Sequence, residues 1–523
     1  MGAGMGFLVL LLCLSVSWAL LRVLCRGGTR SPKRRRPAPP GPWPLPIVGN
    51  LLQLDSRPDK KFAELAKTYG SVMTLQLGRV PTVIISSAQA AREALRTHDL
   101  AFSGRTVPDA ITVHDHDRFS VGWMPVSSPT WSLLRRIMSL HVSATRRLDS
   151  TRALRRRKME EALATVQKRA VSGLPVEIAE IGFMTTCNFL SNALFSMDLV
   201  KPGNEEGGKE LGRLLCLLMV EVGKPNLADY FPVLKWMDPN GRKRRSAMYY
   251  GQLLDMTDDL INKRLQLREK TSEYLTRETD VLDSLLDIWE DKSEEKMIIG
   301  MDHIKHLITD LFVGGTDTIS TTLEWAMAEL LRHPDKLSRA KAELDRVIGR
   351  GHPVEESDIQ RLPYLHATIK ETLRLHPTVP LLLPRKTEAE AEICGFTVQK
   401  GIQVLINVWA IGHDPSLWED PGAFIPERFL GGPPNSSIDF KGQDFELIPF
   451  GAGRRICPGI QLTTRMLHLM LGSLINCFDW KLEAGRWNEA GGDEHGGGSR
   501  HHLATGSSSS CCACAAVSPR AER

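Results

Sequence analysis

The sequence predicts a mainly α-helical protein with a small β subdomain, preceded by one N-terminal transmembrane helix. Amphipathic runs of helical period fill most of the chain after about residue 131. Short alternating or β-branched runs stand before and after this helical part. An uncharged apolar run lies close to the beginning of the chain. With 523 residues, the chain is long enough for a large hydrophobic core.

The apolar run over residues 7–21 is the predicted membrane anchor. Arg22 interrupts it, and Val23 and Leu24 extend it; an arginine at this place can reach the interface. Basic residues between positions 26 and 36 follow, and the positive-inside rule keeps this flank in the cytoplasm. A cleaved signal peptide is the alternative, but the charge of such a peptide precedes its apolar run. We expect an anchor over residues 1–25 and a basic, proline-rich hinge over residues 26–50.

The elements of the body follow in order. Residues 60–69 predict a helix, residues 73–77 alternate, and residues 81–85 are β-branched, so this stretch predicts a small β region. Longer amphipathic runs predict helices over residues 151–171, 247–270, 301–332 and 334–348. Strand signals return over residues 391–405. The ten cysteines are scattered, which favours a reducing compartment, and a net charge of +5 is too small to imply nucleic acid.

The most informative motif runs from Phe450 to Gly459 and matches F-x-x-G-x-R-x-C-x-G in full. A glycine-punctuated loop of this kind can hold the Cys457 thiolate still and turn backbone N–H groups towards its sulfur. We expect Gly453 and Gly459 to adopt backbone conformations that other residues avoid. The alternative is a buried core cysteine in a chance motif.

This loop resembles the haem-binding loop of the cytochromes P450, which are haem-thiolate monooxygenases. The resemblance implies the fold of that family, with Cys457 as the ligand of the iron of haem b and Arg455 beside a haem propionate. Phe450, Gly453 and Gly459 would complete the cofactor-binding loop.

The segment from Leu311 to Thr318 places two adjacent glycines inside a helical pattern, at a cost of about 1 kcal/mol each relative to alanine. That cost suggests that something flat approaches the helix. The segment resembles the oxygen-activating motif of the family, which implies that Thr318 hydrogen-bonds the dioxygen and Asp317 supplies protons. The alternative has Thr318 bonded to a helix carbonyl and Asp317 solvated.

Three further motifs resemble structural or propionate-binding positions of the family. Glu371-x-x-Arg374 puts both side chains on one helix face, and the resemblance implies that they lock a meander together with Arg428 of the P-E-R-F motif. Trp131 and Arg135 lie one helical turn apart, and both side chains are expected to bind the same haem propionate. Arg385 resembles another propionate-binding position.

Two polar segments have less specific interpretations. Residues 114–117 read His-Asp-His-Asp, which indicates a solvated loop rather than a metal site; by resemblance, residues 111–124 would line the substrate pocket. The basic run over residues 146–158 indicates a solvated helical face. Nearby cations, with Arg136 and Arg454, are expected to receive the acidic surface of a flavoprotein reductase.

The resemblance covers residues 39–483. Within this range, residues 51–483 form the expected monooxygenase domain. Segments such as Phe102-Ser103-Gly104-Arg105 look plant-like, and most resemble the group that hydroxylates geraniol and related terpenoids. That implies electrons from NADPH through NADPH–cytochrome P450 reductase and an apolar, terpenoid substrate. It also implies a single-pass protein of the endoplasmic reticulum membrane with its catalytic domain in the cytoplasm.

Residues 484–523 depart from the family pattern. They are rich in Gly, Ser and Ala and predict a disordered tail, which a shifted reading frame or an incorrect gene model would explain. Two alternative functions therefore stay open. One is a thiolate-haem isomerase or dehydratase that acts on a peroxide, which the Asp317-Thr318 pair disfavours. The other is a haem-binding pseudoenzyme disabled by its altered C-terminus.

Overall fold

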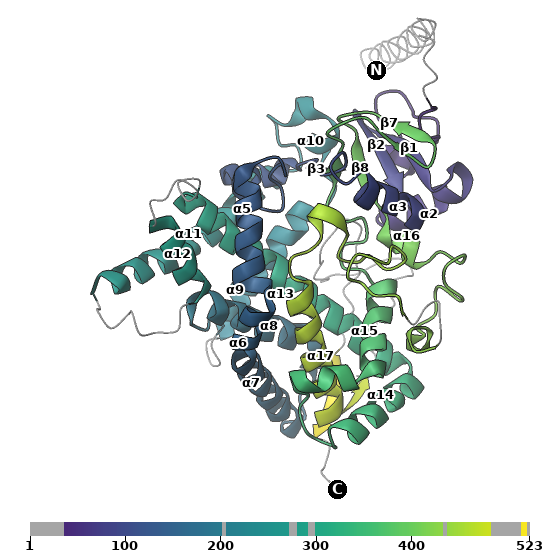
Figure 1. Cartoon of the computed structure of the whole chain (residues 1–523). Coiled ribbons are helices and arrows are strands. Elements are labelled where there is room, and N and C mark those ends of the chain that lie inside the picture. Colours follow the sequence, from purple (N-terminus) through teal and green to yellow (C-terminus); the bar gives the residue numbers. More distant parts are fainter. Residues whose placement is uncertain are drawn as a thin grey trace, which may run out of the picture.

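The structure is a computed structural model that describes residues 36–200, 205–270, 280–290, 299–431, 437–482 and 514–519. Helices dominate the described chain (Figure 1). The α-helices are α2 (Pro58–Tyr69), α3 (Ala88–Arg92), α4 (His116–Phe119), α5 (Pro129–Met138), α6 (Thr145–Ser150), α7 (Arg152–Val171), α8 (Ile178–Phe195), α9 (Glu205–Gly223), α10 (Leu227–Tyr230), α11 (Arg242–Lys270), α12 (Val281–Glu290), α13 (Met301–Arg332), α14 (Pro334–Val347), α15 (Pro363–Leu375), α16 (Val408–Gly412) and α17 (Ile460–Cys477).

The strands of the described chain are short and form three sheets. They are β1 (Val72–Leu77), β2 (Val80–Ile85), β3 (Gly104–Arg105), β4 (Val176–Glu177), β5 (Arg385–Lys386), β6 (Ala391–Ile393), β7 (Phe396–Val398), β8 (Gln403–Ile406), β9 (Phe478–Leu482) and β10 (Cys514–Pro519). The largest sheet has the order β1-β2-β8-β5-β3, in which only β2 and β8 are parallel neighbours. Figure 1 shows this sheet with α2 and α3 in the upper right part of the molecule, while the long helices occupy the rest.

The long helix α13 forms the centre of the helical part. It packs along α8 and also contacts α17, α15 and α11. The close approach of α8 depends on a small residue, because a Cβ atom at Gly182 would lie 2.9 Å from Cβ of Ser320 on α13. Most of α13 is buried, including polar residues, which is typical of a helix that crosses the core of a large domain.

The predicted fold class is confirmed for the described chain, which is mainly helical with a small β region. Helix α13 has the predicted bounds, and the strand signal over residues 391–405 resolves into β6, β7 and the start of β8. No helix of the described residues is long and apolar enough to span a membrane, and the predicted anchor lies outside the described residues.

The predicted disordered tail needs one correction. Residues 514–519 form β10, which lies between β4 and β9 and pairs antiparallel with both. An unpaired β9 would expose a row of backbone N–H and C=O groups, and β10 satisfies them. The prediction of disorder is therefore wrong for these six residues; residues 484–513 and 520–523 lie outside the described chain.

The basic run over residues 146–158 is not a uniformly solvated face. Arg155 and Lys158 on α7 are buried. Arg155 pairs with Glu356 at 2.6 Å, and Lys158 pairs with Asp198 at 2.7 Å. The expectation is therefore wrong for these two residues, whose charges join α7 to neighbouring elements. The sequence could not show this, because the acidic partners lie 201 and 40 residues away.

Several histidines of the core predict a loss of stability in weak acid. Burial lowers the pKa of His306, His366, His413 and His468 to about 4. Between pH 6.5 and 4 the unfolded chain therefore binds protons that the folded protein does not, so the free energy of unfolding falls as the pH is lowered through this window. The effect for fully buried His468 is on the order of 3 kcal/mol.

The free energy of unfolding, measured by urea denaturation at about pH 7, 6 and 5, checks this expectation. The variant His468→Leu should lose less stability between pH 7 and pH 5 than the parent protein. Equal losses in the two proteins would show that His468 does not carry the effect.

Candidate functional site

Cys457 lies in a tight loop between the 3-10 turn Gly453–Arg455 and the start of α17. Its backbone N–H donates to the carbonyl of Phe450 at 3.0 Å, which closes the loop. The N–H of Gly459 lies 3.4 Å from the sulfur. Burial raises the pKa of the Cys457 thiol, while the Gly459 N–H and the Arg135 guanidinium act in the opposite direction. Such a thiol is suited to a cationic metal, which removes its proton on binding.

The glycines of this loop have different roles. Gly453 has φ +68°, and a Cβ atom there would collide with the carbonyl oxygen of Leu95, so glycine is required. Gly451 has φ +69°, which also favours glycine, although a Cβ atom there would meet no close neighbour and the motif alone did not single it out. Gly459 has φ −84°, which any residue adopts. The expectation of an unusual conformation is therefore wrong for Gly459, whose contribution is its N–H.

Four arginines from distant parts of the chain converge beside this loop. They are Arg105 on β3, Arg135 on α5, Arg385 on β5 and Arg455 within the loop. Strand pairing puts Arg105 directly opposite Arg385. Arg135 donates to the carbonyl of Ile456, next to Cys457. The sequence therefore folds so that four cations share one region at the edge of the thiolate loop.

None of these four cations forms an ion pair in the described part of the chain; Asp99 and Glu388 act on Arg385 and Arg455 only from a greater distance. Within the described chain their hydrogen-bond acceptors are backbone carbonyls, such as Phe102 O for Arg385 at 3.1 Å and Ser103 O for Arg455 at 3.0 Å. The buried Nε atom of Arg385 has no hydrogen-bond partner there. Burial, followed by the nearby guanidinium of Arg455, lowers the pKa of Arg385 to about 10. Buried like charges are costly without counter-charge, so this cluster is a site for a polyanionic group.

Arg105 is a site residue that the motifs did not identify. Burial, together with the charges of Arg385, Arg455 and Arg135, lowers its pKa well below the usual value. Its guanidinium donates to the carbonyls of Gly122 and Leu383 at 3.0 and 2.9 Å. A two-residue strand carries no periodic signal, so only the pairing of β3 with β5 reveals its position.

The two glycines of α13 also differ. A Cβ atom at Gly315 would lie 2.7 Å from a methyl group of Leu190, so this glycine allows α8 to pack closely against α13. A Cβ atom at Gly314 would meet nothing within 4 Å. Only Gly314 therefore faces open space, where a flat group has room to approach the helix.

The acid and the hydroxyl that follow these glycines have different surroundings. The Thr318 hydroxyl donates to the Gly314 carbonyl at 2.9 Å, which is the arrangement expected under the alternative interpretation. Asp317 is buried rather than solvated. The carboxyl group and the hydroxyl thus flank the open stretch of α13 from the next turn.

Trp131 and Arg135 lie on successive turns of α5 as expected, but their polar groups point to different acceptors. The indole N–H donates to the carbonyl of Val121 at 3.1 Å, whereas Arg135 donates to that of Ile456. The Trp131 ring also lies 5.1 Å from the guanidinium carbon of Arg455. Helix α5 thus supplies one wall of the arginine cluster.

Glu371, Arg374 and Arg428 meet in a network that is almost entirely buried. Glu371 pairs with Arg374 at 2.8 Å and with Arg428 at 3.1 Å. Arg374 further donates to the carbonyls of Pro421 and Ala423 at 2.7 and 3.0 Å. The network ties α15 to the irregular segment that leads into the Cys457 loop.

The His-Asp-His-Asp segment is only partly solvated. His116 is buried and lies against His306 of α13, so the expectation of a solvated loop is wrong for this residue. His114 and Asp115 are exposed, and Asp117 is half-buried. No group of three or more metal-ligating side chains is present among the described residues.

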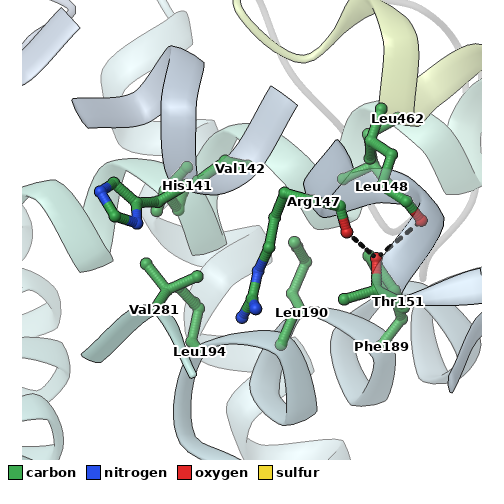
Figure 2. Close-up of a pocket in the computed structure, with 12 residues that line it drawn as sticks. His141, Val142, Arg147, Leu148, Thr151, Phe189, Leu190, Leu194, Val281 and Leu462 are labelled. Carbon is green, nitrogen blue, oxygen red and sulfur yellow. Dashed lines mark hydrogen bonds between the residues drawn. The ribbon is translucent and has the colours of Figure 1, made fainter. Parts of the chain in front are cut away.

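Figure 2 shows a small cavity beside α13. Its volume is about 20 Å³, and its walls come from the helical turn Ser139–Ser143 and from α6, α8, α12, α13 and α17. The polar members are His141, Arg147 and Thr151. Room for about one water molecule and mostly apolar walls do not suit a catalytic site. The candidate site is instead the thiolate loop, the arginine cluster and the open face of α13.

Comparison with known proteins decides the family. The family model described as cytochrome P450 matches residues 39–490. The chain is a cytochrome P450. This P450 is 49% identical over 453 residues to geraniol 8-hydroxylase from Swertia mussotii, which covers 87% of this chain and 89% of that relative. It is 46% identical over 481 residues to drimenol monooxygenase from Persicaria hydropiper, covering 92% of each chain. It is 46% identical over 450 residues to ferruginol synthase from Isodon rubescens, covering 86% and 89%.

Membership of this family makes the P450 a haem-dependent monooxygenase. The residues of the site fit that cofactor. Haem carries two carboxylate groups, which match a cluster of four guanidiniums that form no ion pair in the described chain, and its iron is a suitable partner for a buried thiol. The flat macrocycle matches the open face of α13 at Gly314.

Proposed function

We propose that this cytochrome P450 is anchored in the membrane of the endoplasmic reticulum and inserts one oxygen atom from O₂ into a terpenoid. Electrons come one at a time from NADPH through NADPH–cytochrome P450 reductase. The observation that carries the proposal is that the Cys457 loop lies beside four arginines that form no ion pair with a carboxylate among the described residues. The similarity to relatives named for geraniol, drimenol and ferruginol supports a terpenoid substrate.

The side chains would divide the work as follows. Haem, when bound, would supply the chemistry of dioxygen activation, and Cys457 would hold its iron through a thiolate that donates electron density to it. Arg105, Arg385 and Arg455 hold the propionates by charge-assisted hydrogen bonds. On α13, Thr318 orients the dioxygen at the open face and buried Asp317 passes protons towards it.

Exposed apolar side chains beside the hinge support the membrane location. Trp236 is 84% exposed and Trp43 is 75% exposed, although both are large and apolar. The turn between β1 and β2 joins the two segments that carry them, because the Gly78 N–H donates to the Val48 carbonyl at 3.2 Å and the Arg79 N–H donates to the Tyr230 carbonyl at 2.8 Å. Exposed apolar residues on these segments are Trp43, Leu45, Ile47, Leu52, Leu227, Val233, Trp236 and Met237. Such a surface suits a lipid interface.

The domain organisation of the proposal follows from these features. Residues 1–25 anchor the protein, residues 26–50 form the hinge, and residues 51–483 form the catalytic domain on the cytoplasmic side. Residues 484–523 form an unusual tail. Exposed Arg136 and Arg454 support a reductase-binding face, since cations there would steer the acidic partner.

A reconstituted turnover assay tests the proposal. The full chain is expressed in microsomal membranes together with a reductase. It is expected to oxygenate at least one of three substrates, which are geraniol, drimenol and a precursor of ferruginol. The product should carry one atom of ¹⁸O from ¹⁸O₂. Omission of either NADPH or reductase should abolish turnover. Turnover of a peroxide without NADPH would instead indicate an isomerase or dehydratase. Haem binding without any turnover would indicate a pseudoenzyme.

A further inference from the structure

A short segment of residues 116–121 is fastened to α13 by polar contacts that lie one helical turn apart. Nδ1 of His116 lies 2.8 Å from Nδ1 of His306. One turn later, Asp310 accepts hydrogen bonds from the Ser120 hydroxyl at 2.8 Å and from the Val121 N–H at 2.9 Å. One turn beyond Asp310 stands Gly314, which faces open space. The contacts therefore lead directly to the open face of the site.

The contact between the two imidazoles constrains their protons. A bond between two ring nitrogens needs one proton and one lone pair. Oδ1 of Asp310 lies 3.3 Å from Nε2 of His116, so a proton on that nitrogen satisfies the carboxylate. Nδ1 of His116 then accepts, and Nδ1–H of His306 donates. We call this hydrogen bond, between His116 and His306, the histidine latch.

The histidine latch is sealed from solvent. His116 and His306 are 2% and 4% exposed. The ring of Tyr250 on α11 lies 4.5 Å from that of His116, and the ring of Phe119 lies 5.3 Å from that of His306. A buried polar group that loses its hydrogen-bond partner destabilises the protein, so the two rings are held firmly in their relative positions.

The backbone before the latch is strained. His114 and Asp115 have φ values of +50° and +53°, in the left-handed region that favours glycine. Such conformations persist only where surrounding contacts impose them. One such contact joins Nε2 of His114 to the Ala247 carbonyl of α11 at 2.7 Å, and the histidine latch follows immediately. The segment would not keep this path without these contacts.

The other end of the segment is joined to the arginine cluster. The carbonyl of Val121 accepts hydrogen bonds from the indole of Trp131 at 3.1 Å and from Arg455 at 3.2 Å. The segment therefore spans from the histidine latch to the edge of the cofactor site. A displacement at the latch would move this wall relative to the open face of α13.

We propose that His116 and His306 are positioning residues that determine which carbon of the substrate is oxygenated. They do so by holding residues 116–121 in place beside Gly314, and they touch no reacting atom. A terpenoid offers several similar C–H bonds, so a shift of one wall by a fraction of an ångström changes which of them is nearest to the oxidant. This inference rests on the proposed function for its substrate class.

The test compares three full-length, haem-loaded variants with the parent protein. His306→Leu removes the latch, and His306→Asn restores a donor near the position of Nδ1. His366→Leu is the matched control, because His366 on α15 forms another, partly buried, hydrogen bond between imidazoles, to His468 on α17 at 3.1 Å. The readouts are the ratio of product isomers from a terpenoid substrate and the hydrogen–deuterium exchange of the amides of residues 116–121.

We expect His306→Leu to change the isomer ratio by about threefold or more and to speed amide exchange in the segment about tenfold. His306→Asn and His366→Leu should resemble the parent protein in both readouts. An unchanged ratio and unchanged exchange in haem-loaded His306→Leu would overturn the inference.

Two further outcomes are kept distinct. If the parent protein oxygenates no terpenoid, the proposed substrate class fails, while the exchange readout still decides whether the latch holds the segment. If His306→Leu does not bind haem, His116→Phe replaces it, since a phenyl ring keeps the packing on Tyr250 and removes both hydrogen bonds of His116. Unchanged exchange and an unchanged isomer ratio in that variant would also overturn the inference.

Discussion

Replacement of Cys457 by serine is expected to abolish the strongly red-shifted Soret band of the reduced, carbon monoxide-bound protein. Turnover should fall by about three orders of magnitude or more. A serine hydroxyl does not ionise near neutral pH, so it cannot provide the electron-rich sulfur on which the spectrum and the O–O cleavage depend. The loop itself should persist, since the Cys457 N–H bond to the Phe450 carbonyl is a backbone contact.

Cys477→Ser is the matched control for this experiment. Cys477 ends the same helix, α17, at whose beginning Cys457 lies, and its thiol donates to the Gly351 carbonyl at 3.3 Å. A serine there can make the same hydrogen bond, so spectrum and turnover should be retained. A red-shifted band in Cys457→Ser, or its loss in Cys477→Ser alone, would show that the wrong cysteine had been assigned.

Replacement of Glu371 by glutamine is expected to destabilise the protein by about 3–5 kcal/mol, because it leaves two buried guanidiniums without their anion. The Glu371 carboxylate binds Arg374 and Arg428 and also accepts from the Ile425 N–H at 2.8 Å. All three charged side chains are at most 6% exposed, so water cannot replace the lost charge. The segment that leads to the Cys457 loop should loosen, and little haem-loaded protein should accumulate.

The chain offers a close control on another helix. Glu210 and Arg213 have the same spacing and the same 2.8 Å distance as Glu371 and Arg374, but their side chains are 61% and 64% exposed. Glu210→Gln should therefore leave the stability almost unchanged, because solvent screens an exposed pair. Thermal unfolding and the amount of protein with a red-shifted Soret band measure both variants. Equal stability of the two variants would mean that burial does not decide the strength of these pairs.

Local patterns were sufficient for the parts of the molecule that depend on neighbouring residues. The amphipathic period predicts the bounds of α13 because one continuous helix follows one continuous pattern. The Cys457 loop is recognisable because its glycines, arginine and cysteine lie within ten residues. The Glu371–Arg374 pair likewise follows from helical spacing.

Features that depend on distant pairing were not predictable in the same way. Arg105 and Arg385 are 280 positions apart and meet only because β3 and β5 pair. His116 looked like part of a solvated loop, since its neighbours are polar and its partner His306 lies 190 positions away. The distinction between Gly314 and Gly315 required the position of Leu190 on another helix. In each example, side chains remote in sequence decide the role of a residue.

Strand β10 gives the last residues of the described chain a mechanical role. As the middle strand of its sheet, it joins β4, at the junction of α7 and α8, to β9, directly after α17. The pairing of β10 with β9 therefore fixes the end of α17 that β9 follows, while the other end of this helix begins three positions after Cys457. A truncation before residue 514 would remove this middle strand and leave β9 unpaired, at the end of α17 that is remote from Cys457.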